Sequence, residues 1–324
     1  MTIRIGIVGT DNGHAHLFSG WINGWAEDVP IPARPAGYLD SFYLRWAARR
    51  VELMLESAWG TQRTPIPDVR VTKIWGAVPG QAELIARACD IDCVAATIEE
   101  AVTDVDAVMV LSDLASDHLG HARLSLEAGL PTYIDKPLAP SALEAREIAD
   151  LASAHGARWF SASSLGFSYE IKVARSMVEG LGGLRSLQSK VQNRWADYGI
   201  HSFQMAASFL GHDVKTIRGH TVGTSDIMTL EYRDGRIAVL QNIGGQSRPS
   251  YCATLFCGLG THFIDINDTM ITSLELIEAF VDMVRNDSPA PVSPAEAIRS
   301  IEVVSAGLRA LQIGEVVELP PFEQ

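Results

Sequence analysis

The stretch IRIGIVGTDNGHAH, residues 3–16, decides the fold class of this chain. Its first six residues are mostly apolar and predict a buried strand, and Gly9 marks the turn that follows. A helical stripe comes next, formed by Leu17, Phe18, Trp21, Ile22 and Trp25. A strand, a glycine turn and a helix in this order are typical of the first unit of a doubly wound α/β domain.

The same alternation continues over residues 3–163. Apolar runs predict strands near 3–8, 69–75, 106–112, 131–135 and 157–163. Helical patterns separate them, and one of these, HLGHARLSLEAG, ends at Gly129 as a helix C-terminus should. Strands alternating with helices predict a parallel, Rossmann-like sheet.

The second half of the chain is richer in strand patterns. They fall near 184–195, 213–223, 226–233, 236–243, 250–257 and 260–266, and turns such as YRDGR predict hairpins. Helices are expected over 271–286 and 294–312, the second with Ser293 at its cap and Pro294 in its first turn. The sequence therefore predicts an α/β chain with a Rossmann-like domain, 1–138, and an α+β domain with a mainly antiparallel sheet, 139–324.

A segment near 26–68 interrupts the first domain and is interpreted as an insertion. It carries several prolines around an expected helix from Ser41 to Ala58, and aromatic residues that could cover a ligand or a partner subunit. Packing onto the parent domain is the interpretation that we favour, and we assign the segment no chemistry.

Composition restricts the function classes. The chain has 324 residues, 47% of them hydrophobic, which is enough for two cores. Its 26 Lys and Arg against 39 Asp and Glu give a net charge of −13, which disfavours nucleic acid and anionic membranes as partners. No leader pattern or apolar run of about 20 residues is found, so a cytoplasmic protein is expected. The four cysteines match no zinc template and are interpreted as buried thiols.

Lys136 is the first candidate site residue. It follows the strand in YIDKPLAP, at the edge where open α/β sheets bind ligands. Pro137 restricts the backbone of the lysine to an extended conformation, so that the ammonium group can be aimed into a crevice. The alternative is a solvated surface lysine.

Asp197 and His201 form the second candidate. They lie four residues apart at the start of an expected helix in DYGIHSFQMAASFLG, so their side chains can converge. A carboxylate beside an imidazole raises its basicity and fixes its orientation, as a general base requires. The alternative makes Asp197 a helix cap and His201 a surface residue.

The stretches DKPLAPSALEA and DYGIHSFQMAASFLG resemble the two signatures of the glucose-fructose oxidoreductase and inositol dehydrogenase family, written Gfo/Idh/MocA. Further stretches that resemble this family are TDVDAVMVLSDLASDHLGHARLSLEAGLPTYIDKP, MVEGLGGLRSL and SPAEAIRSIEVVSAGLRALQIGEVVEL. The resemblance spans nearly the whole chain.

This resemblance implies an NAD(P)-dependent oxidoreductase that acts on a CH-OH group of a sugar, cyclic polyol or sugar derivative. His201 would take the hydroxyl proton, Lys136 would stabilise the alkoxide, and Asp197 would orient the imidazolium. The implied cofactor is NAD, with NADP kept open, and no metal is expected. The implied cofactor-binding residues are Gly9, Thr10, Asn12, Gly13, Ser112, Asp113, Asp135 and Lys136. The implied substrate-binding residues are Lys136, Ser163, Asp197 and His201.

The sequence departs from the family at the expected GxGxxG, which reads Gly9, Asp11 and His14. Asp11 could cap the following helix, or its carboxylate could compete with a pyrophosphate. Gly76 stands where a carboxylate would normally hold the adenosine ribose.

Other positions carry smaller departures. Asp135 replaces a glutamate before the lysine, and Gln204 stands where an aspartate often follows the histidine. The stretch FSASSLGF lacks an arginine, so Ser163 and Ser164 suit a neutral hydroxylated substrate.

Several histidines are open to a metal interpretation. His14 and His16, with Asp11, could suggest a metal site, but two histidines spaced by one residue at a helix start point to different faces. His118 and His121 are interpreted as helix-surface residues.

Two other functions stay open. One is a redox-neutral enzyme that retains its nicotinamide and performs hydrolysis or epimerisation by transient oxidation. The other is a non-catalytic family member that has lost the cofactor. A homo-oligomer, a dimer or tetramer, is expected through the C-terminal sheet because strands such as IAVLQNI place apolar residues on its outer face.

Overall fold

The computed structural model describes residues 2–24, 66–244, 251–266 and 269–323. The chain forms two compact units, each made of several segments. Unit 1 comprises Met1–Asp135, Arg146–Ser161 and Leu276–Pro291, and unit 2 comprises Lys136–Ala145, Ala162–Glu275 and Val292–Gln324. The sequence predicted one boundary, at residue 138, because a linear pattern carries no sign that the chain returns. The insertion near 26–68 lies almost wholly outside the described residues.

Unit 1 is built on a six-stranded parallel sheet in the order β3-β2-β1-β4-β5-β6. The central strands are β1 (Ile3–Val8), buried from Ile5 onward, and β4 (Ala107–Val110), buried throughout, because their apolar runs face helices on both sides. The other strands are β2 (Val69–Trp75), β3 (Cys93–Val94), β5 (Thr132–Ile134) and β6 (Trp159–Phe160). The parallel doubly wound sheet is therefore confirmed, and β3 was missed because two residues are too short for a periodic signal.

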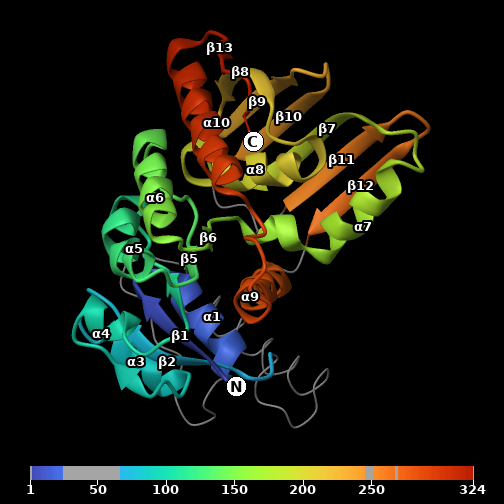
Figure 1. Ribbon diagram of the computed structural model, residues 1–324. Helices are drawn as coiled ribbons and strands as arrows, with labels where there is room; N and C mark the ends of the chain where they lie inside the picture. The colour runs from blue at the N-terminus through green and yellow to red at the C-terminus, as the bar shows by residue number, and fades with distance from the viewer. Residues whose placement is uncertain (1, 25–65, 245–250, 267–268, 324) are drawn as a thin grey trace. The chain divides into compact units, whose positions relative to one another are not determined.

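Helices connect the strands of this sheet (Figure 1). They are α1 (Gly13–Asn23), α3 (Gln81–Ala88), α4 (Ile98–Val102), the 3-10 turn η1 (Ala115–Asp117), α5 (His118–Glu127) and α6 (Ala142–His155). Helix α9 (Thr269–Arg285) follows β12 in the chain, and its residues from Leu276 onward belong to unit 1. Because β1 pairs with both β2 and β4, the strand order reverses beside β1. The loops after β1 and β4 therefore lie next to each other at the carboxyl edge, where α/β sheets bind ligands.

Unit 2 contains a seven-stranded sheet in the order β12-β11-β7-β10-β9-β8-β13. Every neighbouring pair is antiparallel except β7 and β10, which are parallel, so the predicted mainly antiparallel sheet is confirmed. The strands are β7 (Leu184–Gln192), β8 (Val214–Val222), β9 (Ser225–Tyr232), β10 (Ile237–Ile243), β11 (Tyr251–Cys257), β12 (Thr261–Ile266) and β13 (Val317–Glu318).

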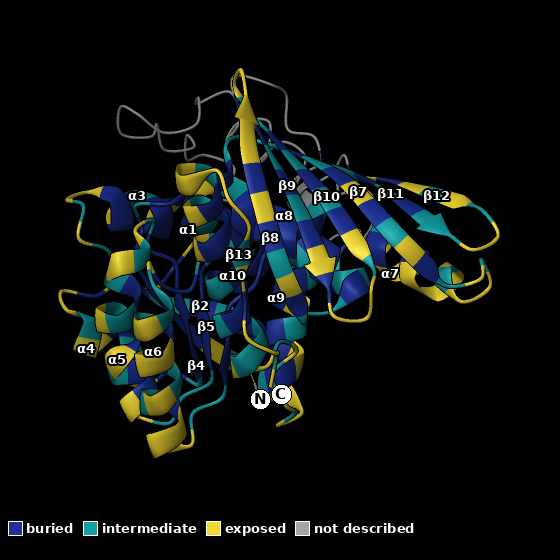
Figure 2. Ribbon diagram, turned by 90° about the horizontal axis from the view of Figure 1, so that it is seen from above, coloured by how far each residue is buried: buried dark blue, intermediate teal, exposed yellow. Residues whose placement is uncertain are grey.

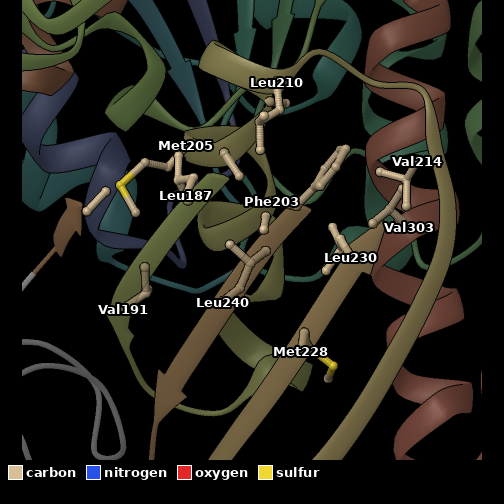
Figure 3. Close-up of a cluster of buried hydrophobic side chains, with 14 of the residues drawn as sticks. Leu187, Val191, Phe203, Met205, Leu210, Val214, Met228, Leu230, Leu240 and Val303 are labelled. Atoms are coloured by element: carbon tan, nitrogen blue, oxygen red, sulfur yellow. The ribbon is translucent and has the colours of Figure 1, made fainter. Parts of the chain in front are cut away.

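One face of this sheet is covered by helices, and their contact forms the core of unit 2. The helices of the unit include α7 (Tyr169–Val178), α8 (Trp195–Leu210) and α10 (Pro294–Ile313), preceded by the 3-10 turn η2 (Ser164–Phe167). Helix α8 packs on β7 and β10, and α10 packs on β8 and on α8. The buried cluster between them includes Leu187, Phe203, Met205, Leu230 and Val303 (Figure 3).

Buried and exposed residues alternate along these strands, as Figure 2 shows. In β10, Ala238 and Leu240 are buried and face the helices, whereas Ile237 is 42% exposed on the opposite face. The period of two therefore explains why one face builds the core and the other remains open.

The last long helix begins as the sequence predicts. Ser293 caps α10, its hydroxyl accepting from the backbone N-H of Glu296, whose carboxylate in turn accepts from the N-H of Ser293. Gly314, in the left-handed conformation, ends the helix.

All four cysteines are free thiols. The prediction of buried thiols is correct for Cys89 and wrong for Cys93, Cys252 and Cys257, which are half-buried. The last two lie in β11, whose outer face is open, so their strand position accounts for the difference. Within the described ranges, no helix has both the length and the apolar character to cross a membrane.

Candidate active site

The loop after β1 approaches the loop after β4 very closely. Gly9 has φ of 99°, and a Cβ at this position would lie 2.5 Å from both the backbone nitrogen and the hydroxyl of Ser112. Glycine is therefore required twice, by its conformation and by this approach. Two of the predicted cofactor-binding residues, Gly9 and Ser112, are thus brought together at the carboxyl edge of the sheet.

Asn12 caps helix α1. Its side-chain oxygen accepts a hydrogen bond from the backbone nitrogen of His14 at 2.6 Å, and Gly13 is the first helical residue. The expectation that Asp11 caps this helix is wrong, because the helix starts one residue too late for Asp11 to reach its free N-H groups. Asp11 is half-buried beside the cap.

Asp135 follows β5 and is fully buried. One carboxylate oxygen accepts from the Asn12 amide at 2.6 Å and lies 2.7 Å from Nδ1 of His14, and the other accepts from the Tyr133 hydroxyl at 3.1 Å. Burial, together with the nearby Asp135 carboxylate, raises the pKa of Tyr133 well above its usual value, so the phenol stays protonated and donates. The carboxylate therefore ties the cap of α1 to the end of β5.

His14 and His16 point to different partners, as predicted. His14 pairs with Asp135 and stacks on Phe18, whereas Nε2 of His16 lies 3.0 Å from the Gln81 side chain.

The loop after β4 is held by two histidines of α5. His118 is buried and its Nε2 lies 3.1 Å from the carbonyl oxygen of Ser112, while Nδ1 of His121 lies 2.5 Å from the Ser112 hydroxyl. Burial lowers the pKa of His121. Their interpretation as helix-surface residues is wrong, because both face the strand end rather than solvent. Asp113 follows Ser112 and is half-buried.

Gly76, at the end of β2, packs against Thr10. A Cβ on Gly76 would overlap the Thr10 hydroxyl and lie 2.8 Å from the Thr10 Cβ. The side chain of Thr10 is 1% exposed, and its hydroxyl oxygen has no hydrogen-bond partner in the described part of the chain. The position that a ribose-binding carboxylate would occupy is therefore closed by Thr10.

The contacts around Gly9 and Asn12 suit the pyrophosphate of a dinucleotide, whereas those around Gly76 do not provide the usual ribose-binding carboxylate. A glycine turn that permits close backbone approach, next to the N-terminus of an 11-residue helix, is what a pyrophosphate requires. Gly9, Thr10, Asn12 and Gly13 form that turn, with Ser112 beside it. Position 76 supplies no carboxylate that could accept hydrogen bonds from an adenosine ribose.

In unit 2, His201 lies on α8 and is 8% exposed. Its Nδ1 lies 2.6 Å from the hydroxyl of Ser163, which follows β6 and is 1% exposed. The rings of Tyr198 and Tyr251 contact the imidazole, with centroids 4.8 and 6.2 Å away. Ser163 and His201, both predicted site residues, are therefore brought together.

Asp197 lies in the first turn of α8 and is exposed. It contributes to raising the pKa of Arg194, although a hydrogen bond to Asp226 is the largest cause. The sequence predicted that Asp197 would orient the imidazole of His201. In the structure, the Ser163 hydroxyl makes the contact with Nδ1 of His201.

The start of α8 is anchored by Asp226. Its carboxylate accepts from Nε and Nη2 of Arg194 at 2.7 and 2.6 Å, from the backbone nitrogen of Trp195 at 3.0 Å and from the Thr221 hydroxyl at 2.7 Å. Burial alone would raise the pKa of Asp226, but these hydrogen bonds together lower it. The turn that carries Asp197 is thereby fixed to β9.

Lys136 is half-buried and follows Asp135 directly, and its peptide bond to Pro137 is cis. Because Asp135 is held at both carboxylate oxygens, the backbone just before Lys136 is fixed. The predicted placement of Lys136 after β5 matches the structure.

Sequence reasoning missed four residues that support these groups: His14, Tyr133, Gln204 and Asp226. His14, Gln204 and Asp226 are hydrogen-bonded to residues 31 to 121 positions away, so no local sequence pattern could predict these contacts. Tyr133 had a local signal, since it lies in β5 two positions before Asp135, and residues two apart in an extended chain point to the same side.

One model of a protein family matches part of the chain. The model of the oxidoreductase family with an NAD-binding Rossmann fold, GFO_IDH_MocA, matches residues 49–163. No curated protein sequence matches the chain.

Solved structures share the fold along the whole chain. Myo-inositol 2-dehydrogenase from Lactobacillus plantarum is 14% identical, with a TM-score of 0.77 over 99% of this chain and 100% of that chain. A myo-inositol dehydrogenase from Corynebacterium glutamicum is 16% identical, with a TM-score of 0.74 over 99% and 100%. Scyllo-inositol dehydrogenase from Lactobacillus casei, solved with bound NAD(H) and scyllo-inositol, is 14% identical, with a TM-score of 0.73 over 98% and 99%.

A parallel sheet with a glycine turn at its switch point, followed by a mainly antiparallel sheet, defines a two-unit fold whose first unit is of the Rossmann type. Residues 49–163 match the Gfo/Idh/MocA family of oxidoreductases, and the resemblance predicted from the sequence is confirmed over this range.

Proposed function

We propose that this protein oxidises or reduces a hydroxyl or keto group of a sugar, cyclic polyol or sugar derivative with a nicotinamide cofactor. The observation that carries the proposal is the buried His201, whose Nδ1 is engaged by a hydroxyl in the same unit that contains Lys136. The inositol dehydrogenases among the structures of the same fold support this substrate class.

The proposed roles follow from the chemistry of each side chain. His201 moves the proton of the substrate hydroxyl at Nε2, because Nδ1 is engaged by Ser163. Lys136 stabilises the alkoxide as a cation, and Asp197 contributes a negative charge at the start of α8. The nicotinamide, when bound, supplies hydride transfer.

NAD is the proposed cofactor. The turn of Gly9, Thr10, Asn12 and Gly13 would hold the pyrophosphate, and Ser112 would line the same edge. Asp113 and Asp135 are proposed to contribute through their loops, Asp135 by fixing the cap of α1 rather than by direct contact, since its carboxylate is buried.

Cofactor binding tests the proposal first. Calorimetric titration with NAD and with NADP should give saturable binding of at least one. Absence of binding of both to cofactor-free protein would favour the non-catalytic alternative. A stoichiometric dinucleotide extracted from the purified protein would favour the redox-neutral one.

Turnover tests the assigned roles. A thermal-shift screen of both dinucleotides crossed with polyols and sugars should select substrates for assay. Lys136→Ala and His201→Asn should each lower kcat about 100-fold or more without unfolding the protein. Full activity of Lys136→Ala on every substrate found would refute its role.

We also propose that the open face of the unit 2 sheet pairs with a second copy of the chain. The strand registers place Val239 of β10 in the middle of a row that runs from Phe263 on β12 to Arg218 on β8. Phe263 is 60% exposed and Ile237 lies on the same face. Apolar side chains on an open sheet favour burial against a like surface.

A further inference from the structure

The hydroxyl of Ser163 and the imidazole of His201 form a buried hydrogen-bonded pair. Their polar atoms are 2.6 Å apart, and neither residue is more than 8% exposed. A hydrogen bond shielded from water in this way constrains the ring more strongly than one at the surface.

Ser163 is itself held at two atoms. Its backbone nitrogen donates to the side-chain oxygen of Gln204 at 2.6 Å, and its hydroxyl accepts from the backbone nitrogen of Leu165 at 3.3 Å. Gln204 follows His201 by about one helical turn. Both side chains of α8 therefore form hydrogen bonds with Ser163.

Further hydrogen bonds connect Gln204 to α10. The amide nitrogen of Gln204 donates to the Ser300 hydroxyl at 3.3 Å, and that hydroxyl donates to the carbonyl oxygen of Glu296 at 2.9 Å. These hydrogen bonds link Ser163 through Gln204 to α10, so the position of Ser163 is fixed by other elements of unit 2 as well as by its own loop.

We propose that Ser163 is the positioning residue of His201, in place of a carboxylate; this rests on the proposed function, in which His201 moves the substrate proton. A serine hydroxyl both donates and accepts, so it can bond Nδ1 whether or not that nitrogen carries a proton. Ser163 therefore holds the ring in both states of the reaction without adding a charge.

The neutral partner has a chemical consequence. A hydroxyl stabilises the imidazolium less than a carboxylate and more than a methyl group, so residue 163 should set the pKa of His201. The rings of two titratable groups, Tyr198 on α8 and Tyr251 on β11, contact the imidazole, and Asp197 lies one turn earlier on α8.

Histidine titration by NMR tests this directly. Protein labelled at the imidazole ring is titrated, and His201→Gln assigns the signal. Ser163→Ala should lower the midpoint of His201 by about 1 pH unit, because the charge-assisted bond to the imidazolium is lost. Ser163→Thr should restore the midpoint, and Ser163→Asp should raise it above that of the unaltered protein.

Ser168→Ala is the matched control. Ser168 is a buried serine of the same segment, and its hydroxyl accepts from the backbone nitrogen of Ile171 at the start of α7. This variant loses a comparable capping bond but should leave the midpoint of His201 unchanged.

Activity provides the second measurement. Ser163→Ala should lower kcat about tenfold with little change in KM, and Ser163→Thr should recover most of the loss. An unchanged His201 midpoint in Ser163→Ala overturns the proposal, whether or not substrate is turned over. A shifted midpoint without turnover on either cofactor would support the Ser163 contact and refute the proposed reaction.

Discussion

At the scale of single residues, the carboxyl edge of the unit 1 sheet is organised by polar groups that satisfy one another. Asp135 is the centre, since it accepts from Asn12 and Tyr133 and pairs with His14. An aspartate suits this task, because its short side chain keeps the carboxylate close to the strand. The buried charge is tolerated because three side chains compensate it.

Asp135→Asn should show how much this network stabilises the fold. The variant leaves His14 without its anionic partner, so the free energy of unfolding in urea should fall by about 3 kcal/mol. Asp106→Asn is the control, because its partner Arg4 lies at the surface, and it should cause only a small loss. Equal losses in the two variants would contradict the central role of Asp135.

Thr10 and Gly76 control the adenosine end of the proposed cofactor site. Gly76→Asp alone should destabilise the protein, because the new side chain overlaps Thr10. Combined with Thr10→Gly, the carboxylate gains room to accept from a ribose, and the Kd for NAD should fall about tenfold relative to that for NADP. Thr10→Gly alone is the control in the calorimetric comparison. No gain in NAD preference for the pair would show that the ribose lies elsewhere.

At the scale of secondary structure, most elements could be predicted because their signals are local. Strands of six residues or more have a clear apolar period, and α10 has a capping box that starts with Ser293. Strands β3 and β13, of two residues each, exist only through pairing with neighbours and leave no pattern. The contacts of the site also depend on residues that are distant in the sequence. Ser163 and His201 are 38 positions apart, and only the fold brings them together.

The anchor of α8 predicts an acid-dependent stability. The pKa of Asp226 is lower in the folded than in the unfolded protein, so its stabilisation is present above the unfolded value, about 3.9, and is lost as the pH falls through the lowered folded value. Asp226→Asn should therefore reduce the free energy of unfolding at neutral pH by about 2 kcal/mol and flatten its dependence on pH in acid.

Urea unfolding from pH 3 to pH 7 measures both effects of Asp226→Asn. Asp234→Asn removes a carboxylate that pairs with Arg236 and is half exposed, and it should cost less. A parallel loss at every pH in Asp226→Asn would contradict the ionised role of Asp226.

At the scale of the whole molecule, the division into units follows from where the cores lie, and sequence patterns locate those cores only in part. The chain enters unit 1 again through Arg146–Ser161 and Leu276–Pro291. Their apolar stripes look like any other helix or strand in the sequence, so a single boundary was the simplest prediction. The change from a parallel to a mainly antiparallel sheet was visible, because short turns without helices join β8 to β9, β9 to β10 and β11 to β12.

The open face of the seven-stranded sheet carries the last prediction. If a second copy covers it, light scattering should give a mass of at least two chains, and Val239→Arg should give a single chain, because the cation would be buried at the centre of the row. Val94→Arg is the control: Val94 is also an exposed valine, at the edge of the unit 1 sheet, and this variant should keep the mass of the unaltered protein. A monomeric unaltered protein, or an assembly that survives Val239→Arg, would contradict this surface as the interface.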